Sequence, residues 1–490
     1  MAAPPPKRTW SISWSNTSLT SPKRQKTSPS RDTVEIIKKL NHAVNQKERE
    51  AIISQVCELC DHNITSVHEE ELAAGADSAL TKHLAFLRLK EQLEQQSAVP
   101  LNHSRVAHEI SRTLEALEMV YRSSPDAVAK SFVSVGLEVV DLLLQVITFQ
   151  LKGRQVGVGI KVESDTEDSN SVDDKGSVGS SNTNMPSPTL SSQQRRNPDS
   201  DFQLRIATKI IAHFARVGSA TQPMAHHSGL LACLKRVVDC DMYEIPSEAR
   251  LNSLWIIANL ACNADNMIMM AWHPGLLDSL VWASSRPTYS VESTPRTMEV
   301  LRTHSIAARA LLNLSWSPEN KIPMSEHSNL VDVLSKMIVC RHTCPNKGTR
   351  SILAQTRCHA VGALRNIAAA PRRNKIRLCK HGCGRVLDAL TDAVLYDTDP
   401  RIKSRAFAAV YNLACHDTAR TIVEKPALLG ALSDAMRDTS SNDIKSMARS
   451  VLHSLEKSIT PDMACYHVLR EFLNMVSMSE EGEHVPTEAV

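Results

Sequence analysis

The sequence LNSLWIIANLACNADN, residues Leu251–Asn266, contains a pattern of residue sizes that returns three more times in the chain. Asn259 serves as an anchor for the comparison. The corresponding asparagines are Asn313 in AARALLNLSWSPEN, Asn366 in AVGALRNIAAAPRRN and Asn412 in AFAAVYNLACHDTA. Each position relative to the anchor then forms a column that can be compared across the four copies.

The columns around the anchor agree in side-chain size. Small residues stand six positions before the anchor (Ser253, Ala307, Ala360, Ala406) and two after it (Ala261, Ser315, Ala368, Ala414). Bulky residues stand two positions before the anchor (Ile257, Leu311, Leu364, Val410) and one after it (Leu260, Leu314, Ile367, Leu413). These offsets lie on one side of a helix, so each copy predicts a helix with one buried stripe. The alternation of small and large residues predicts that such helices pack directly against one another.

The spacing of the anchors predicts a solenoid. Counted from His213, which occupies the same column in TKIIAHFARV, the anchors are 46, 54, 53 and 46 residues apart. The two long intervals contain the polar, proline-bearing segments Ser284–Thr297 and Arg341–Arg350, which we expect to be loops. Without these segments the period falls within the roughly 40 to 47 residues that are typical of stacked two- or three-helix units. Met119 and Ser454 take the anchor position in the two end units.

The repeated run resembles the armadillo repeat of beta-catenin-like and importin-alpha-like proteins. The resemblance rests on the ALxNL run, a following turn with Pro or Asn, a short helix, and a Gly turn such as His381–Gly384 or Pro274–Gly275. It covers roughly two thirds of the chain and implies an all-α, right-handed armadillo-type solenoid of about seven repeats.

Composition agrees with this fold class. A chain of 490 residues with 4% aromatic residues and 16 glycines suits packed helices rather than strands. The net charge of +3 is too small for a protein that binds polyanions over its whole surface. Twelve cysteines without a signal peptide predict a reducing compartment, where cysteines such as Cys262 and Cys415 behave as small buried residues. The most apolar run, Ser131–Phe149, contains Glu138 and Asp141, so we expect no membrane span and no secretion.

The chain divides into six predicted segments. They are a disordered basic tail rich in Pro and Ser (1–31), capping helices (32–100), a first repeat (101–151), a disordered acidic, Ser-rich insertion (152–200), further repeats (201–477) and a disordered acidic C-terminus (478–490).

Two basic clusters in the tail resemble a bipartite nuclear import signal. They contain Lys7 and Arg8, and Lys23, Arg24 and Lys26. The alternative is a solvated tail with no such role. We therefore expect the protein in the nucleus, the cytoplasm or both.

The four anchor asparagines are the first candidate binding residues. In the solenoid they lie on the third helix of successive units, along one inner surface. A side-chain amide offers donors and an acceptor, so a row of amides can bind the backbone of an extended peptide. The resemblance to the armadillo family implies this role for Asn259, Asn313, Asn366 and Asn412. The alternative is that each amide caps or cross-links neighbouring helices.

Tryptophans and arginines add to the candidate groove. Importin-alpha-like proteins carry Trp four residues before the Asn to hold lysine side chains, and only Trp255 matches here. The other occupants of this column are Arg309, Gly362 and Ala408, so a row of lysine slots is not expected. Arg309 and Arg365 instead favour a peptide that is acidic or phosphorylated.

Three cysteine clusters are candidate metal sites. Cys340–Cys344 and Cys379–Cys383 each contain two cysteines around a histidine, and Cys57 and Cys60 form one CxxC. We interpret the first two as turns, and the CxxC lies within a predicted helix. Because structural zinc needs four ligands, we predict no metal or other cofactor.

A basic segment, Arg372–Arg385, could bind an anion through residues that include Arg372, Arg373, Lys375 and Arg377. With no interleaved aromatic residues, a protein or phosphate contact is favoured over nucleic acid.

The sequence as a whole predicts a monomeric, non-catalytic scaffold or adaptor that binds an extended peptide of a protein partner. It contains no phosphate-binding glycine loop and no serine elbow, so we predict no enzyme. Two alternatives stay open. One is a nuclear transport carrier of importin-alpha type, and the other is a nucleic-acid-associated factor that uses the basic segment.

Overall fold

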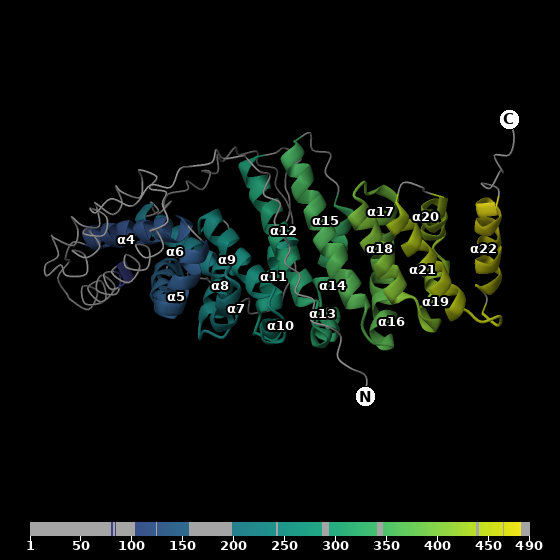
Figure 1. Cartoon of the computed structure of the whole chain (residues 1–490), viewed down its shortest axis with the longest axis horizontal. Coiled ribbons are helices and arrows are strands. Elements are labelled where there is room, and N and C mark those ends of the chain that lie inside the picture. Colours follow the sequence, from purple (N-terminus) through teal and green to yellow (C-terminus); the bar gives the residue numbers. More distant parts are fainter. Residues whose placement is uncertain are drawn as a thin grey trace, which may run out of the picture.

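The computed structural model of the chain describes residues 80, 81, 84, 103–123, 125–155, 198–241, 244–286, 294–340, 346–437, 441–463 and 465–481. In these ranges every regular element is a helix, with nineteen α-helices, α4 to α22, and two 3-10 helices. The helices follow one another along an elongated stack from α4 at one end to α22 at the other (Figure 1). The predicted all-α solenoid is confirmed.

Seven helices carry the anchor column, and consecutive members pack against one another. In the central units each follows two shorter helices, so we name the seven the third helices. They are α4 (His103–Ser123), α6 (Pro198–Phe214), α9 (Ser247–Leu260), α12 (Pro295–Leu314), α15 (Lys347–Ala368), α18 (Pro400–Leu413) and α21 (Asn442–Ser458).

The first and second helices of the units form two further rows. The first helices are α7 (Gly218–Ala225), α10 (Ala264–Ala271), η1 with α13 (Pro318–Asn320, Lys321–Glu326), α16 (Arg372–Lys380) and α19 (His416–Val423), and they follow the lower edge in Figure 1. The second helices are α8 (Leu230–Asp239), α11 (Leu276–Ser285), α14 (Leu330–Val339), α17 (Arg385–Tyr396) and α20 (Pro426–Arg437), and they also pack in sequence. One long helix, α5 (Pro125–Gln155), stands in place of both between α4 and α6. The 3-10 helix η2 (His381–Cys383) lies between α16 and α17, and α22 (Tyr466–Glu481) follows the last unit.

The four size columns predicted from the sequence are all buried. Every one of the sixteen side chains has a relative exposure of 7% or less. The fourteen apolar ones belong to one continuous apolar core that runs through all the units. Stacking therefore buries the stripe that a single unit would leave exposed.

The glycine turns have a backbone reason. Gly229, Gly275 and Gly384 directly precede α8, α11 and α17, and their φ angles are 88°, 70° and 93°. Side chains other than glycine rarely adopt this left-handed region, so glycine permits the sharp turn into each second helix.

Two of the predicted loops are shorter than expected. Helix α12 begins at Pro295 and α15 begins at Lys347, inside the segments predicted to be loops. Thr294 and Asn346 cap the two helices by accepting hydrogen bonds from the backbone N–H groups of Thr297 and Gly348. The prediction was wrong at these ends because a proline at the first helical position, as in α12, and an asparagine cap, as in α15, are both compatible with a helix start. Both helices reach beyond their neighbours at the upper edge of the stack (Figure 1).

A row of polar contacts ties the third helices to the ends of the second helices. Arg250, which has no exposed surface, donates to the carbonyl oxygens of Cys240 and Asp241 at 3.1 and 2.9 Å. His304 and Arg357, in the same column of α12 and α15, contact the carbonyl oxygens of Arg286 and Cys340 at 3.0 and 3.5 Å. The last carbonyls of a helix lack partners within it, and these side chains supply them.

Several predicted segments lie outside the described residues. These are the tail (1–31), most of the capping region (32–100), the central part of the insertion (156–197) and the end of the chain from 482. Within the capping region, Leu80, Thr81 and Leu84 are helical and buried. Helix α5 continues to Gln155, α6 starts at Pro198 and α22 continues to Glu481, so these helices extend past the predicted boundaries. None of the described helices has the length and apolar character needed to cross a lipid bilayer.

Candidate functional site

The anchor asparagines lie near the C-terminal ends of four consecutive third helices, α9, α12, α15 and α18. The structure therefore brings together the row that the sequence predicts. Asn366 is buried, with 6% exposure, whereas Asn259, Asn313 and Asn412 are half-buried.

Three of the four amide nitrogens point to the preceding unit. Asn313 Nδ2 donates to the carbonyl oxygen of Ala258 at 2.8 Å, and Asn412 Nδ2 donates to that of Arg365 at 2.9 Å. Each acceptor stands one position before the anchor of the preceding third helix. Asn366 Nδ2 donates to Ser315 Oγ at 3.1 Å, and Ser315 in turn donates to the carbonyl of Leu312, in the same column, at 2.6 Å.

These carbonyls need a partner because α9, α12 and α15 each end in a tighter turn. The N–H groups of Cys262, Trp316 and Ala369 bond to the anchor carbonyls three residues back, at 3.0 to 3.2 Å. An α-helical turn would have bonded them four residues back, to Ala258, Leu312 and Arg365. The asparagine of the next unit donates directly to the carbonyls of Ala258 and Arg365. Ser315, which accepts from Asn366, donates to the carbonyl of Leu312. Cross-linking of neighbouring units is thus a geometric role of these amide nitrogens.

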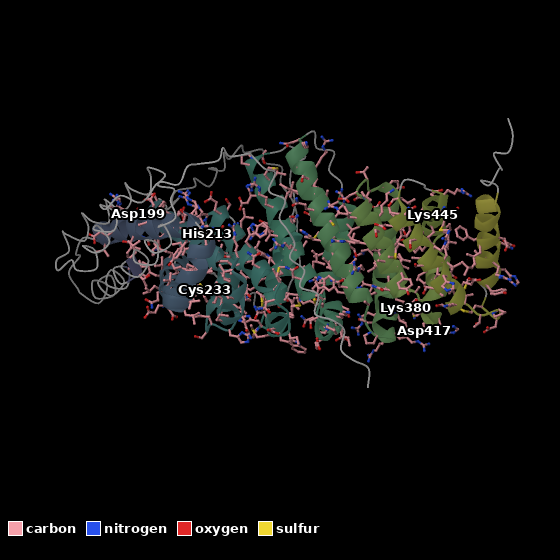
Figure 2. The ribbon with its side chains drawn as sticks, viewed as in Figure 1. Asp199, His213, Cys233, Lys380, Asp417 and Lys445 are labelled. Carbon is pink, nitrogen blue, oxygen red and sulfur yellow. The ribbon has the colours of Figure 1, made fainter. Side chains whose placement is uncertain are left out.

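At the equivalent place between α4 and α6, the two third helices are joined by charged side chains. His213, in the anchor column of α6, lies with Nε2 3.4 Å from Glu118 Oε1 on α4, and Lys209 Nζ lies 2.9 Å from the same oxygen. Burial alone would raise the pKa of the Glu118 carboxyl, but hydrogen bonds from His213 and Lys209, with nearby positive charges, lower it to about 2. Figure 2 shows His213 in this part of the stack.

The single tryptophan in the importin-type column is already covered. The guanidinium of Arg309 lies 4.8 Å from the centre of the Trp255 ring, and its Nη2 lies 3.4 Å from Asn259 Oδ1. Burial lowers the pKa of Arg309. An arginine of the next unit thus occupies the ring face that a lysine of a bound peptide would use.

Arg365 has a similar arrangement one unit further on. Its guanidinium lies 5.9 Å from the ring of Trp316, which is 53% exposed at the end of α12. Burial, followed by the positive charge of Arg405, lowers the pKa of Arg365. Neither Trp316 nor Arg405 stands out in the sequence, because their columns contain different residue types in the other units.

A second row of asparagines was not predicted from the sequence. Asn266, Asn320 and Asn374, seven or eight residues after the anchors, are at most 4% exposed. The amide of Asn266 donates to the carbonyls of Leu260 and Thr221 at 3.0 and 2.9 Å. Asn320 makes the equivalent pair of bonds at 2.9 Å each, and Asn374 contacts Ile367 at 3.3 Å. Their regular spacing, near the start of the first helix that follows each third helix, was the signal that could have revealed them.

The basic segment Arg372–Arg385 is partly neutralised by neighbouring units. Arg372 pairs with Asp417, Arg377 with Glu326 at 2.5 Å, and Arg385 with Asp332. Arg373 and Lys375 have no ion pair in the described part of the chain. Figure 2 places Lys380 and Asp417 at the lower edge, along the first helices, away from Lys445 near the start of α21. The predicted anion patch thus keeps only part of its charge free.

The sequence predicts buried cysteines, and this prediction was wrong for several of them. Cys233, Cys358, Cys379 and Cys465 are buried, but Cys262 and Cys383 are exposed and Cys415 is half-buried. Cys262 stands three residues after the anchor, where the chain has left the core. Its sulfur lies 3.0 Å from Asn313 Nδ2.

No group of three metal-ligand side chains converges among the described residues. In the cluster Cys379–Cys383, His381 lies 3.1 Å from Asp332, and burial raises the pKa of Cys379 to about 12. The other predicted clusters lie partly or wholly outside the described residues, as do the import-signal residues Lys7, Arg8, Lys23, Arg24 and Lys26.

Similarity to known proteins is found among solved structures. No family model matches the chain, and no curated protein matches it. An engineered protein of known structure is similar over 91% of this chain and 94% of its own, with 16% identity and a TM-score of 0.49. A computationally designed armadillo repeat protein for modular peptide recognition is similar over 51% of this chain and 93% of its own, with 20% identity and a TM-score of 0.40. Another designed armadillo repeat protein, in complex with the peptide (KR)4, covers 53% of this chain and 95% of its own, with 20% identity and a TM-score of 0.41.

Proposed function

We propose that the protein is a non-catalytic scaffold that binds an extended, acidic peptide segment of a partner protein across the exposed side of α12, α15 and α18. We name this surface the third-helix face. It includes the exposed or half-buried side chains of Arg302, Arg309, Trp316, Arg365 and Arg405.

The charge of these three helices carries the proposal. Together they contain ten Lys and Arg residues and one carboxylate, Glu299. Glu299 pairs with the buried Arg250 at 3.0 Å and is therefore already neutralised. Within the described residues, Arg302, Arg365 and Arg405 have no carboxylate in ion-pair distance. An acidic segment would supply the missing negative charge along three successive units.

The geometry suits a chain that lies across the helices. Arg309 and Arg365 are each held against a tryptophan of the preceding unit, which restricts their side chains before a partner binds. Within the described part of the chain, the half-buried amides of Asn313 and Asn412 bond through their nitrogens, so their oxygens can accept from the N–H groups of a peptide.

Selection from a random peptide display library tests the proposal. The full-length chain should enrich peptides rich in Asp and Glu, and binding should fall as salt concentration rises. An Arg309→Gln, Arg365→Gln double variant should lose most of this enrichment, whereas Arg437→Gln, at the exposed end of α20, should retain it. Enrichment of basic peptides, or equal enrichment by the double variant, would refute the proposal.

A further inference from the structure

We infer that Arg365 and Arg405 form a site for a phosphoryl group carried by the bound peptide, so that the third-helix face distinguishes a phosphorylated side chain from Asp or Glu. This inference rests on the proposed function and names the chemistry of one position within it.

Arg405 reaches from α18 onto the surface of α15. Its Nη1 donates to the carbonyl oxygen of Cys358 at 2.9 Å and lies 3.1 Å from the Cys358 sulfur. The backbone of α15 permits this approach because the next turn contains Gly362. A Cβ atom at Gly362 would lie 3.2 Å from Arg405 Nη1 and 3.0 Å from Leu312 Cδ1. The equivalent position holds Trp255 and Arg309 in other units, so the close approach is particular to this pair of helices.

Arg365 lies one helical turn beyond Gly362 on α15. Trp316 flanks its guanidinium at 5.9 Å on the side of the preceding unit. Each arginine is thus held by the unit that precedes its own, Arg405 by the Cys358 carbonyl and Arg365 by the Trp316 ring. Two planar guanidinium groups can each offer paired N–H donors to the oxygens of one phosphoryl group.

Among the described residues, neither Arg365 nor Arg405 has a carboxylate within ion-pair distance. The carboxylates nearest in sequence, Asp397 and Asp399, pair with Arg357 at 2.6 Å and Arg401 at 2.7 Å. Burial, together with the charges of Arg309, Arg405 and Arg401, lowers the pKa of the neighbouring His359 to about 4, so this imidazole stays neutral near pH 7. Like charges held together in a half-buried place destabilise the free protein, and an anion removes that cost.

The charge of the ligand decides between phosphate and carboxylate. A phosphoserine or phosphothreonine carries about −2 charge near pH 7 and three acceptor oxygens, whereas Asp or Glu carries one charge and two oxygens. The paired arginines should therefore favour the phosphorylated side chain by about tenfold or more in Kd.

Fluorescence anisotropy with three peptide pools tests the inference. The pools share one acidic background and differ at a fixed central position, which is phosphoserine, serine or aspartate. The full-length wild-type chain should bind the phosphoserine pool about tenfold more tightly than the aspartate pool. Arg365→Gln and Arg405→Gln should each reduce this preference to about twofold, and Arg405→Lys should give an intermediate value because it keeps charge without the fork.

The controls separate this site from general basicity. Arg302→Gln, which removes another arginine of the third-helix face, should weaken all three pools alike and leave the preference unchanged. Equal binding of the phosphoserine and aspartate pools by the wild type, or a preference that survives in both Arg365→Gln and Arg405→Gln, would overturn the inference while leaving the proposed function in place. Inorganic phosphate that displaces the serine pool as well as it displaces the phosphoserine pool would also overturn it. Failure of every pool to bind would instead refute the proposed function.

Discussion

Asn412 donates its side-chain N–H to the backbone carbonyl of Arg365 in the preceding unit at 2.9 Å, and this bond joins the amide row to the arginine row. Arg365 therefore has two roles. Its backbone carbonyl accepts from the next unit, and its side chain faces the proposed peptide. The arrangement links stacking of the units to the position of the binding side chains. It also predicts which asparagines stabilise the fold.

Asn313→Ala and Asn412→Ala should each lower the free energy of unfolding by about 1–2 kcal/mol, because each removes the amide donor to a helix-end carbonyl. Asn259 is a matched control, since within the described residues its amide makes one long bond, at 3.4 Å, through its oxygen. Asn259→Ala should cost less than about 1 kcal/mol. Urea unfolding followed by circular dichroism measures all three. Equal losses for all three variants would contradict the assigned cross-link.

The buried second row should matter more than the anchors. Asn320→Ala removes a side chain with no exposed surface that satisfies two carbonyls, so we expect a loss of about 2–3 kcal/mol. Asn442→Ala, at an exposed position on α21, should change stability by less than about 0.5 kcal/mol. Thermal unfolding of the two variants compares them. A melting temperature for Asn320→Ala as high as that of Asn442→Ala would contradict the stabilising role of the second row of asparagines.

The contact around Glu118 predicts the acid response of the first unit. The folded-state pKa of Glu118 is about 2, below its ordinary value of 4.5, so the carboxylate stabilises the fold fully above about pH 4.5. This contribution, roughly 3 kcal/mol, is lost as the pH falls from about 4.5 to about 2. Hydrogen exchange in α4 and α6, compared with α20 at each pH, should show this loss.

The variant Glu118→Gln should lower protection in α4 and α6 near pH 7 and reduce its further decline on acidification. Glu138→Gln, at an exposed position on α5, is the matched control and should behave as the wild type. An acid response of Glu118→Gln as steep as that of the wild type would assign the sensitivity to other carboxylates.

Cysteine reactivity distinguishes exposed cysteines from those in the core. Cys262 and Cys383 are exposed, whereas burial raises the pKa of Cys233 to about 11 and that of Cys379 to about 12. Iodoacetamide should therefore modify Cys262 and Cys383 at least about tenfold faster in the native protein. Peptide mass spectrometry measures each rate. Modification of Cys379 as fast as that of Cys262 would contradict the described packing.

The sequence predicted the core because the size columns are a local property of each copy. Burial of Ile257 or Leu311 needs only the helix period and a neighbour of the same kind. The starts of α12 and α15 were not predicted, because Pro295 and the residues around Lys347 resemble loop residues outside a helix as well as in its first turn.

The candidate site was predicted only in part. The sequence placed the anchor amides on successive third helices, but not the direction of their nitrogens, because the partner is a backbone carbonyl freed by a tight turn in another unit. Arg405 gave no periodic signal. Its column contains Asn252, Ile306 and His359 in the other units, and its position over α15 depends on the missing side chain of Gly362.

Photo-cross-linking of a selected peptide tests the central claim most directly. The most enriched acidic peptide, with a photoreactive residue at its centre, would be irradiated on the full-length chain and the attached residues mapped by mass spectrometry. We predict cross-links on α12, α15 and α18, close to Trp316 and Arg365, that disappear when unlabelled peptide is added in excess. Competable cross-links confined to the first helices α10, α13 and α16 would contradict the account.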